Sequence, residues 1–309
     1  TGFSSEIFRL SWNDSAQSPA SCIVKLPLPG GSQTEKICRE AAFYACLAPQ
    51  AGISVPRCYS AAEEKGEILV LEDLKDCRFG DESQGCSLRE AEAAVDALTG
   101  LHARWWNHPQ LCAYQWLPRY GNVLRQLEKL PQRRETFFRN YGKVLQHESL
   151  ELAGALNTRH ESVFHRLQQA PETLLHTDSH LDNLAFRDVE GRVEVILFDW
   201  QNVSRGPAVV DLALFLVSAS TQSCDWEQTA IVKRYHASLS SQGGIDYSFD
   251  QFDIDFRIAL LRWWIGTVNG FGSPAAQLWS GRQAELAQRS VSHWNDVIRK
   301  FQLRELIPQ

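Results

Sequence analysis

Residues 174–199 read LLHTDSHLDNLAFRDVEGRVEVILFD, and this stretch decides how the rest of the chain is interpreted. It places His176, Asp178 and Asn183 in the spacing H-x-D-x-x-x-x-N. A second aspartate, Asp199, follows sixteen residues after Asn183 and ends an apolar run. Carboxylate and amide oxygens are the hard ligands that Mg²⁺ prefers. The pattern therefore predicts a site for a metal ion and a nucleotide.

The order of these polar groups fits the transfer of a phosphoryl group to a hydroxyl. Such a transfer needs a carboxylate that orients the hydroxyl and accepts its proton, and it needs ligands for Mg²⁺ on the phosphates. We assign the first role to Asp178 as the catalytic base. Asn183 and Asp199 are then the metal ligands. The alternative is a loop rich in Asp and His whose side chains only cap turns.

A hairpin is expected between the two predicted metal ligands. Residues 183–186 and 193–198 are mainly apolar, and turn residues at 188–191 separate them. Because a hairpin brings its two ends together, Asn183 and Asp199 are expected to lie side by side.

The composition is that of an ordinary globular protein, with 44% hydrophobic and 22% charged residues. A length of 309 residues exceeds one comfortable core and predicts two lobes, at 1–78 and 79–309. The net charge of −6 argues against nucleic acid or an anionic membrane as the main partner. We expect no membrane span and no signal peptide. The sequence does not indicate an oligomeric state.

The eight cysteines lack the CxxC and CxxH spacings of zinc sites. We therefore expect reduced, mostly buried thiols in a cytoplasmic protein rather than disulfides or zinc ligands.

The first lobe is expected to be a small β-rich unit with one helix. Strands are predicted at 6–12 and 21–26, and apolar positions at helical spacing predict a helix at 35–47. Lys25 falls inside an apolar strand, where its charge is costly unless it is used. A strand Lys paired with a helix Glu such as Glu40 is how kinases orient a lysine onto phosphates. The alternative is a solvent-facing Lys and an unrelated helix Glu.

Two further segments of this lobe are candidates for nucleotide contacts. Ser4 and Ser5 follow a glycine before the first strand, where backbone N–H groups could cover phosphates. The strand predicted at 67–72 runs into a connector, and Glu72, Asp73 and Leu74 are expected to offer backbone groups to a base such as adenine. A plain connector is the alternative.

From residue 80 onward the pattern becomes helical. Ser87 and Glu90 form a capping box that opens a helix, on which His102 is expected to be a hydrogen-bonded packing residue. An apolar stripe over 287–301 predicts a last helix that packs onto the lobe. Five tryptophans either belong to the core or line an apolar or cation-binding pocket. They are Trp105, Trp106, Trp116, Trp263 and Trp264.

The motifs resemble the aminoglycoside phosphotransferase and choline kinase-like branch of the protein-kinase-like fold. The resemblance rests on Lys25, Glu40, HTDSHLDN at 176–183 and FDWQ at 198–201, and it covers roughly residues 1–220. The finer segments REAAFY at 39–44, PRCYSA at 56–61, LEDL at 71–74 and DLALFL at 211–216 look most like its ecdysteroid kinase-like subgroup.

The resemblance implies an α+β, bilobal fold with a small antiparallel sheet in the N-terminal lobe and a larger, mainly helical C-terminal lobe. It also implies ATP or GTP with Mg²⁺, and phosphorylation of a small-molecule hydroxyl acceptor, either sterol-like, an amino alcohol or an aminoglycoside. In that scheme Asp178 is the base, Lys25 is the phosphate lysine with Glu40 as its partner, and Asp211 holds the catalytic loop by its backbone. A catalytically inactive, nucleotide-binding member of the fold is the alternative.

Two departures from protein kinases bear on regulation. Trp200 and Gln201 follow Asp199 where protein kinases have Phe-Gly, and Thr177 takes the place of the Arg before the catalytic Asp. We therefore expect a site that is competent without phosphorylation. His180 is expected to pack the loop rather than to carry a proton.

Overall fold

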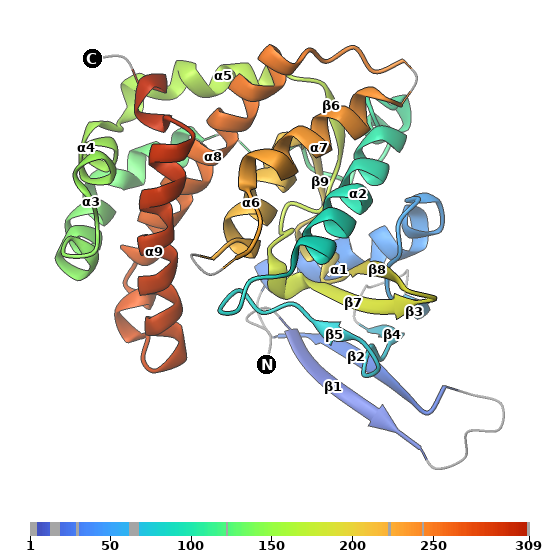
Figure 1. Ribbon diagram of the computed structural model, residues 1–309. Helices are drawn as coiled ribbons and strands as arrows, with labels where there is room; N and C mark the ends of the chain where they lie inside the picture. Colours follow the sequence, from blue (N-terminus) through green and yellow to red (C-terminus); the bar gives the residue numbers. More distant parts are fainter. Residues whose placement is uncertain are drawn as a thin grey trace.

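The computed structural model describes residues 5–12, 19–28, 31–61, 68–121, 123–221, 224–242 and 244–307. The described strands form three antiparallel sheets, with the orders β1-β2-β4-β3, β5-β7-β8 and β6-β9 (Figure 1). The strands are β1 (Ser5–Ser11), β2 (Ser21–Pro27), β3 (Cys58–Ala61), β4 (Leu69–Glu72), β5 (Arg78–Phe79), β6 (Glu172–Leu175), β7 (Leu184–Val189), β8 (Arg192–Leu197) and β9 (Ser204–Pro207).

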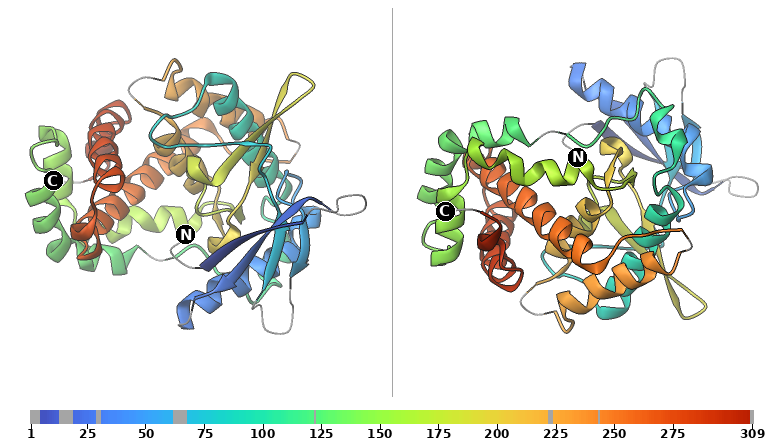
Figure 2. Two further views of the ribbon diagram at one scale, coloured as in Figure 1. Left: turned by 90° about the horizontal axis from the view of Figure 1, so that it is seen from below. Right: turned by 90° about the horizontal axis from the view of Figure 1, so that it is seen from above.

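The α-helices lie mainly in the second part of the chain. They are α1 (Gly31–Cys46), α2 (Leu88–Arg104), α3 (Leu124–Tyr141), α4 (His147–Ala155), α5 (Glu161–Gln169), α6 (Val209–Ala219), α7 (Gln228–Ser240), α8 (Phe249–Phe271) and α9 (Arg282–Lys300). Both views of Figure 2 place α3, α4 and α9 at one end of the molecule and the four-stranded sheet at the other. None of the described helices is both long and apolar enough to span a membrane.

The four-stranded sheet and α1 form the N-terminal lobe, as the sequence predicts. β2 lies between β1 and β4, so Lys25 faces Ile7 on one side and Leu69 on the other. The apolar side chains of Ile7, Phe8 and Leu10 on β1 are all exposed, and β1 is an edge strand of this sheet. The helix begins at Gly31, four residues before the predicted start.

The connector after β4 joins the two lobes through a small apolar cluster. Leu74 and Cys77 pack with Ala185 on β7 and Ile196 on β8. β5 then pairs with β7. The connector is therefore held against the β7-β8 hairpin of the second lobe.

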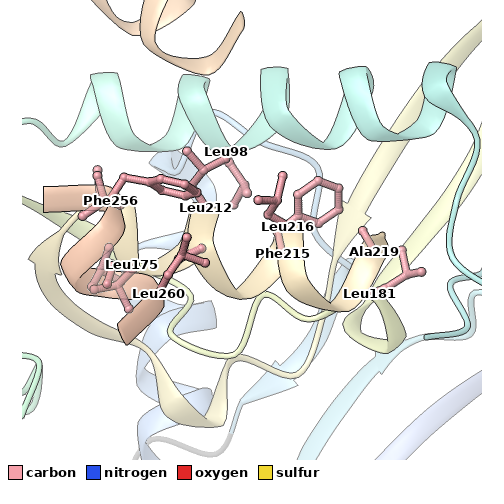
Figure 3. Close-up of a cluster of buried hydrophobic side chains, with 14 of the residues drawn as sticks. Leu98, Leu175, Leu181, Leu212, Phe215, Leu216, Ala219, Phe256 and Leu260 are labelled. Carbon is pink, nitrogen blue, oxygen red and sulfur yellow. The ribbon is translucent and has the colours of Figure 1, made fainter. Parts of the chain in front are cut away.

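The core of the second lobe lies where α2, α6 and α8 meet. Figure 3 shows Leu98 of α2, Leu212 of α6 and Leu260 of α8 together in one apolar cluster, and Leu181 lies at one end of this cluster. All four side chains are almost completely buried. Leu181 lies within the HTDSHLDN motif at 176–183, so the core of the lobe fixes that loop directly.

Several sequence predictions for the helical lobe are confirmed. Ser87 caps α2 and Glu90 closes the capping box. His102 is buried, with Nδ1 2.6 Å from the Tyr235 hydroxyl and Nε2 3.3 Å from Asp211. The predicted stripe on α9 is also buried. It consists of Ala287, Val291, Trp294, Ile298 and Phe301.

The cysteines are free, as expected, but they are not mostly buried. Cys22, Cys77 and Cys86 are buried, whereas Cys46 and Cys112 are exposed. The exposed pair lies at the end of α1 and in the short turn after α2, where a small apolar side chain can remain at the surface without enlarging an apolar patch.

Candidate active site

The loop that carries the first motif is held by the N-terminal end of α6. The Asp211 carboxylate accepts the backbone N–H groups of His176 and Thr177, both at 2.7 Å. Thr177 has φ 67°, a left-handed conformation that is costly for a residue with a Cβ. The two hydrogen bonds to Asp211 stabilise this turn, and the turn directs the next residue, Asp178, into the site.

Asp178 is anchored but still accessible. Its Oδ2 accepts a hydrogen bond of 2.9 Å from the Asn202 amide, and its Oδ1 lies 3.6 Å from His180 Nε2. The side chain is 28% exposed. One carboxylate is thus fixed in orientation and remains open to a substrate hydroxyl.

The two predicted metal ligands lie at the same end of the β7-β8 hairpin. The Phe198 N–H donates to the Asn183 carbonyl at 3.1 Å, so Asp199 follows directly beside Asn183. The Asn183 amide nitrogen donates to the Asp178 carbonyl at 2.9 Å, and no described residue donates to its Oδ1. Asp199 has φ 64°, a second left-handed residue in the same site.

These two side chains fit a Mg²⁺ ion that keeps most of its ligands from phosphate and water. The described residues contain no group of three or more His, Cys, Asp or Glu side chains that could hold a metal ion. Two protein oxygen ligands are nevertheless usual for Mg²⁺ on a nucleotide. Asn183 Oδ1 and the Asp199 carboxylate are the two oxygen groups here that could hold such an ion.

Lys25 joins the two lobes electrostatically. Its Nζ lies 2.8 Å from Glu40 Oε1 and 2.9 Å from Asp199 Oδ1. Burial lowers the pKa of Lys25, but Glu40 and Asp199 outweigh burial, so this pKa lies above its ordinary value. Burial has the opposite effect on Glu40, which is 2% exposed: it raises the pKa of this carboxyl. Lys25 opposes that rise only in part. The predicted strand Lys and helix Glu are therefore paired, and Asp199 shares the cation.

The neutral imidazole of His176 lies between Asp178 and the turn that carries Asp199. Burial lowers its pKa despite the nearby carboxylates. The Asp178 N–H donates to its Nδ1 at 3.3 Å, and its Nε2 donates to the Phe198 carbonyl at 2.9 Å. The imidazole therefore fixes the spacing between Asp178 and the start of the Asp199 turn.

The predicted base-binding residues have mainly structural side chains. The Asp73 carboxylate accepts hydrogen bonds from Arg9 and Ser21, and that of Glu72 accepts one from Arg187 at 3.2 Å.

Leu74 is buried in the small apolar cluster of the connector. Its backbone N–H makes no hydrogen bond within the described part of the chain. Ser5 begins β1 opposite Pro27, and Ser4 lies outside the described residues. No functional role for Ser4 or Ser5 follows from these positions.

Two residues beside Asp178 were not predicted. Asn202 could have been found from the sequence, because it lies three residues after Asp199 within the same motif. Glu82 has no sequence signal. Its carboxylate lies 2.7 Å from His180 Nδ1; burial lowers the pKa of His180, but Glu82 and Asp178 raise it to about 9. Gly80 allows this approach, since a Cβ there would lie 2.0 Å from the Leu181 carbonyl oxygen.

A cavity of about 480 Å³ extends from Glu82 between α6, α8 and α9. Its charged lining residues are Glu82 and Arg289, and Trp263 contributes an aromatic wall. The other tryptophans that were pocket candidates do not line it. Trp105 and Trp264 are buried in the core, and Trp106 and Trp116 pack on Tyr247 and Tyr114.

The fold is bilobal and kinase-like, and Lys25, Asp178 and Asp199 lie together where the two lobes meet. The model of the phosphotransferase enzyme family (APH) matches residues 1–250, so the chain belongs to this family. A comparison with curated proteins finds no significant match.

Solved structures share the fold at low identity. The gentamicin complex of APH(2'')-IIa is 15% identical over 93% of this chain and 90% of that chain, with a TM-score of 0.57. A Plasmodium vivax ethanolamine kinase is 12% identical over 96% and 83% of the two chains, with a TM-score of 0.56. ADP-bound APH(2'')-Ib is 15% identical over 94% of each chain, with a TM-score of 0.53. The predicted bilobal, kinase-like fold is confirmed.

Proposed function

We propose that the protein transfers the γ-phosphoryl group of ATP or GTP to a hydroxyl of a small molecule, in a reaction that depends on Mg²⁺. The observation that carries this proposal is the meeting of Asp178, Asn183, Asp199 and Lys25 at one place between the lobes. Phosphoryl transfer depends mainly on positioning and on charge neutralisation. This arrangement supplies both.

Each side chain has a distinct proposed role. Asn202 holds Asp178 so that its accessible oxygen can orient the acceptor hydroxyl and take its proton. Asn183 and Asp199 hold Mg²⁺, which when bound neutralises charge on the phosphates. Lys25, oriented by Glu40, binds phosphate oxygens. The pair of carboxylates on Lys25 keeps it charged for that purpose.

The connector is the proposed site of the nucleotide base. The Leu74 N–H is the proposed donor to the base, because it makes no hydrogen bond within the described residues. The side chains of Glu72 and Asp73 fix the connector, and only its backbone faces a ligand in this proposal. The likeness to an ADP-bound phosphotransferase supports nucleotide binding at this fold.

Trp200 supports the expectation that the site is competent without phosphorylation. Its ring is buried and stacked on Phe43 of α1, with centroids 3.9 Å apart and planes 8° apart. The backbone N–H of Trp200 donates to Glu40 Oε1 at 3.3 Å. A turn fixed by these contacts does not need a phosphate on a neighbouring loop to hold Asp199 in place.

The cavity beside Glu82 is the proposed acceptor site. The charges of its two charged lining residues, Glu82 and Arg289, cancel each other. Glu82 is already paired with His180. A polycationic aminoglycoside would need a more acidic wall. A volume of about 480 Å³ and the Trp263 and Trp294 rings suit a lipophilic body, and the serine and threonine hydroxyls along the rest of the wall suit its hydroxyl group. We therefore favour a sterol-like acceptor, in line with the resemblance to the ecdysteroid kinase-like subgroup.

A catalytically inactive, nucleotide-binding protein is the second candidate. Its retention of a base, two metal ligands and a phosphate lysine disfavours it, because binding alone does not need Asp178. Turnover separates the two candidates.

The deciding experiment compares ATP turnover of the wild type and Asp178→Ala across sterols, amino alcohols, sugars and aminoglycosides with Mg²⁺. We expect one acceptor class to support turnover and Asp178→Ala to lower kcat by about 10²–10⁴. ATP affinity should change little, because the base does not bind the nucleotide.

Asp188→Ala is the matched control. It removes an aspartate from the far turn of the same hairpin, where the carboxylate accepts the Gly191 N–H. Equal turnover by the wild type and Asp178→Ala would overturn the assignment of the base. ATP binding without turnover of any acceptor class would favour the inactive candidate.

A further inference from the structure

A buried arginine near β9 carries a charge that the proposed reaction does not use. Arg262 on α8 is 8% exposed, and no described carboxylate pairs with it. One of its terminal nitrogens donates to the neutral Gln126 side chain, and its Cζ lies 5.7 Å from the centre of the Tyr120 ring. Its Nε–H is buried and has no hydrogen-bond partner among the residues that the structure describes. A buried charge in this state is costly, so an anion would stabilise it.

Arg262 lines a cavity of about 290 Å³ that is separate from the proposed acceptor site. Arg119 and Glu172 also line it, so its wall carries two cations and one carboxylate. The Glu172 carboxylate is already occupied, since Arg119 and Arg205 both pair with it. It therefore does not compensate Arg262, and the cavity keeps a net positive charge.

The other lining residues indicate the chemical character of a ligand that would fit this cavity. Val123, Phe164 and Leu167 supply an apolar side. An anionic group on a short apolar body matches one guanidinium beside such a surface, because a guanidinium binds carboxylate and phosphate oxygens with its fork of N–H donors.

We propose that this cavity binds a small organic anion, a carboxylate or a phosphate ester, through Arg262. The cavity wall includes Gly206 of β9. In the same strand, the Ser204 hydroxyl lies 2.5 Å from the Thr177 hydroxyl, next to Asp178 in the chain. A ligand in the cavity thus rests on the strand that supports the catalytic loop.

The test measures thermal unfolding of the full chain with inorganic phosphate, butyrate or phenylacetate, and with the neutral isosteres butyramide and phenylacetamide. At about ten times its Kd, an anion should raise the Tm of the wild type by about 2 °C, and its neutral isostere should not. Arg262→Gln and Arg262→Met should both lose the shift. Both variants remove a buried charge, so at least one is expected to fold.

Two controls separate this site from the nucleotide site. Lys25→Met should keep the anion shift, because Lys25 lies in the proposed phosphate site of the nucleotide. Arg289→Gln removes an arginine from the other cavity and should also keep it. Anions that fail to stabilise the wild type, or that stabilise both Arg262 variants equally, would overturn the proposal.

A hydroxylated analogue of butyrate then shows whether the bound anion is an acceptor or an effector. Phosphorylation of hydroxybutyrate, with a KM raised at least tenfold in Arg262→Gln, would identify an acceptor bound through its anionic group. An anion shift without turnover would identify an effector. The anion test uses no nucleotide, so it stands or falls independently of the proposed kinase activity.

Discussion

At the scale of single residues, the Lys25 ion pairs combine a stability cost with a functional gain. Glu40 is buried, and burial raises its pKa although Lys25 opposes the rise. The same contacts raise the pKa of Lys25. A buried pair of this kind adds little net stability over a well-packed apolar pair, but loss of one partner is expensive. The ion pairs therefore contribute little to stability, but they keep Lys25 charged beside Asp199.

Lys25→Met tests this account of the pair. The substitution leaves Glu40 buried without its cation, and we expect the free energy of unfolding to fall by about 3–5 kcal/mol at pH 8. A carboxyl with a raised folded-state pKa stabilises the fold at low pH and loses that contribution as the pH rises through this pKa. Loss of Lys25 should raise the pKa of Glu40 further, so the deficit should shrink toward pH 5.

Urea unfolding at several pH values measures the deficit. Lys75→Met is the control, because Lys75 is exposed on the connector, and it should change stability by less than about 0.5 kcal/mol. A deficit for Lys25→Met that stays constant from pH 8 to pH 5 would contradict the proposed protonation of Glu40.

At the scale of secondary-structure elements, α6 acts as the support of the catalytic loop. Asp211 in its first turn accepts the His176 and Thr177 N–H groups, and the Ser218 hydroxyl near its end accepts the Leu181 N–H at 2.9 Å. The loop is therefore bound along the helix at both of its ends. Its conformation depends on these contacts rather than on its own sequence preference, because Thr177 is in a left-handed conformation.

Asp211→Ala should release one end of the loop. It leaves two N–H groups without acceptors. Each costs about 1–3 kcal/mol, so we expect the free energy of unfolding to fall by about 2–6 kcal/mol. Asp211→Asn keeps one carbonyl oxygen and should lose about half as much. Chemical denaturation measures the loss, and hydrogen exchange at Thr177 should accelerate in both variants. Asp225→Ala, an exposed aspartate, is the control; equal effects at the two positions would exclude the supporting role of Asp211.

The features that could be predicted from the sequence are those whose interacting residues lie close together along the chain. The hairpin, the capping box at Ser87 and the α9 stripe depend on neighbours within a few turns, and all three were predicted. The pairing of Lys25 with Glu40 was predicted as well, because a lysine in an apolar strand needs a partner. The second partner of Lys25, Asp199, was not predicted, because it belongs to the other lobe.

The features that were missed depend on residues far apart in the chain. Glu82 reaches His180 across nearly a hundred positions, and Arg262 faces Tyr120 across more than a hundred. Neither contact leaves a spacing that a single sequence can reveal. The tryptophans show the same limit, since composition could not separate Trp263, which lines a cavity, from Trp264, which is in the core. Only the packing of α8 decides which neighbouring residue faces which side.

At the scale of the whole molecule, Lys25 links the two lobes beside the proposed site. Lys25 belongs to the N-terminal lobe and Asp199 to the other, and their ion pair of 2.9 Å lies where Mg²⁺ and phosphates are proposed to bind. In the proposed complex Asp199 would hold Mg²⁺, and Lys25 would bind phosphate oxygens. A nucleotide with Mg²⁺ would then hold the lobes together more strongly than either alone.

A non-hydrolysable ATP analogue tests this linkage in the full chain. In the presence of Mg²⁺, the analogue at about a hundred times its own Kd should stabilise the fold by about 2.7 kcal/mol. This corresponds to a rise in Tm of about 4 °C for a chain of this size. Removal of Mg²⁺ with EDTA should abolish most of the rise. Asp199→Asn should remove the same part even with Mg²⁺ present, because an amide cannot supply the charge, whereas Asp188→Asn on the far turn should keep it. A rise of equal size with and without Mg²⁺, or its full retention in Asp199→Asn, would show that the nucleotide binds without the metal site and would separate Asp199 from the proposed chemistry.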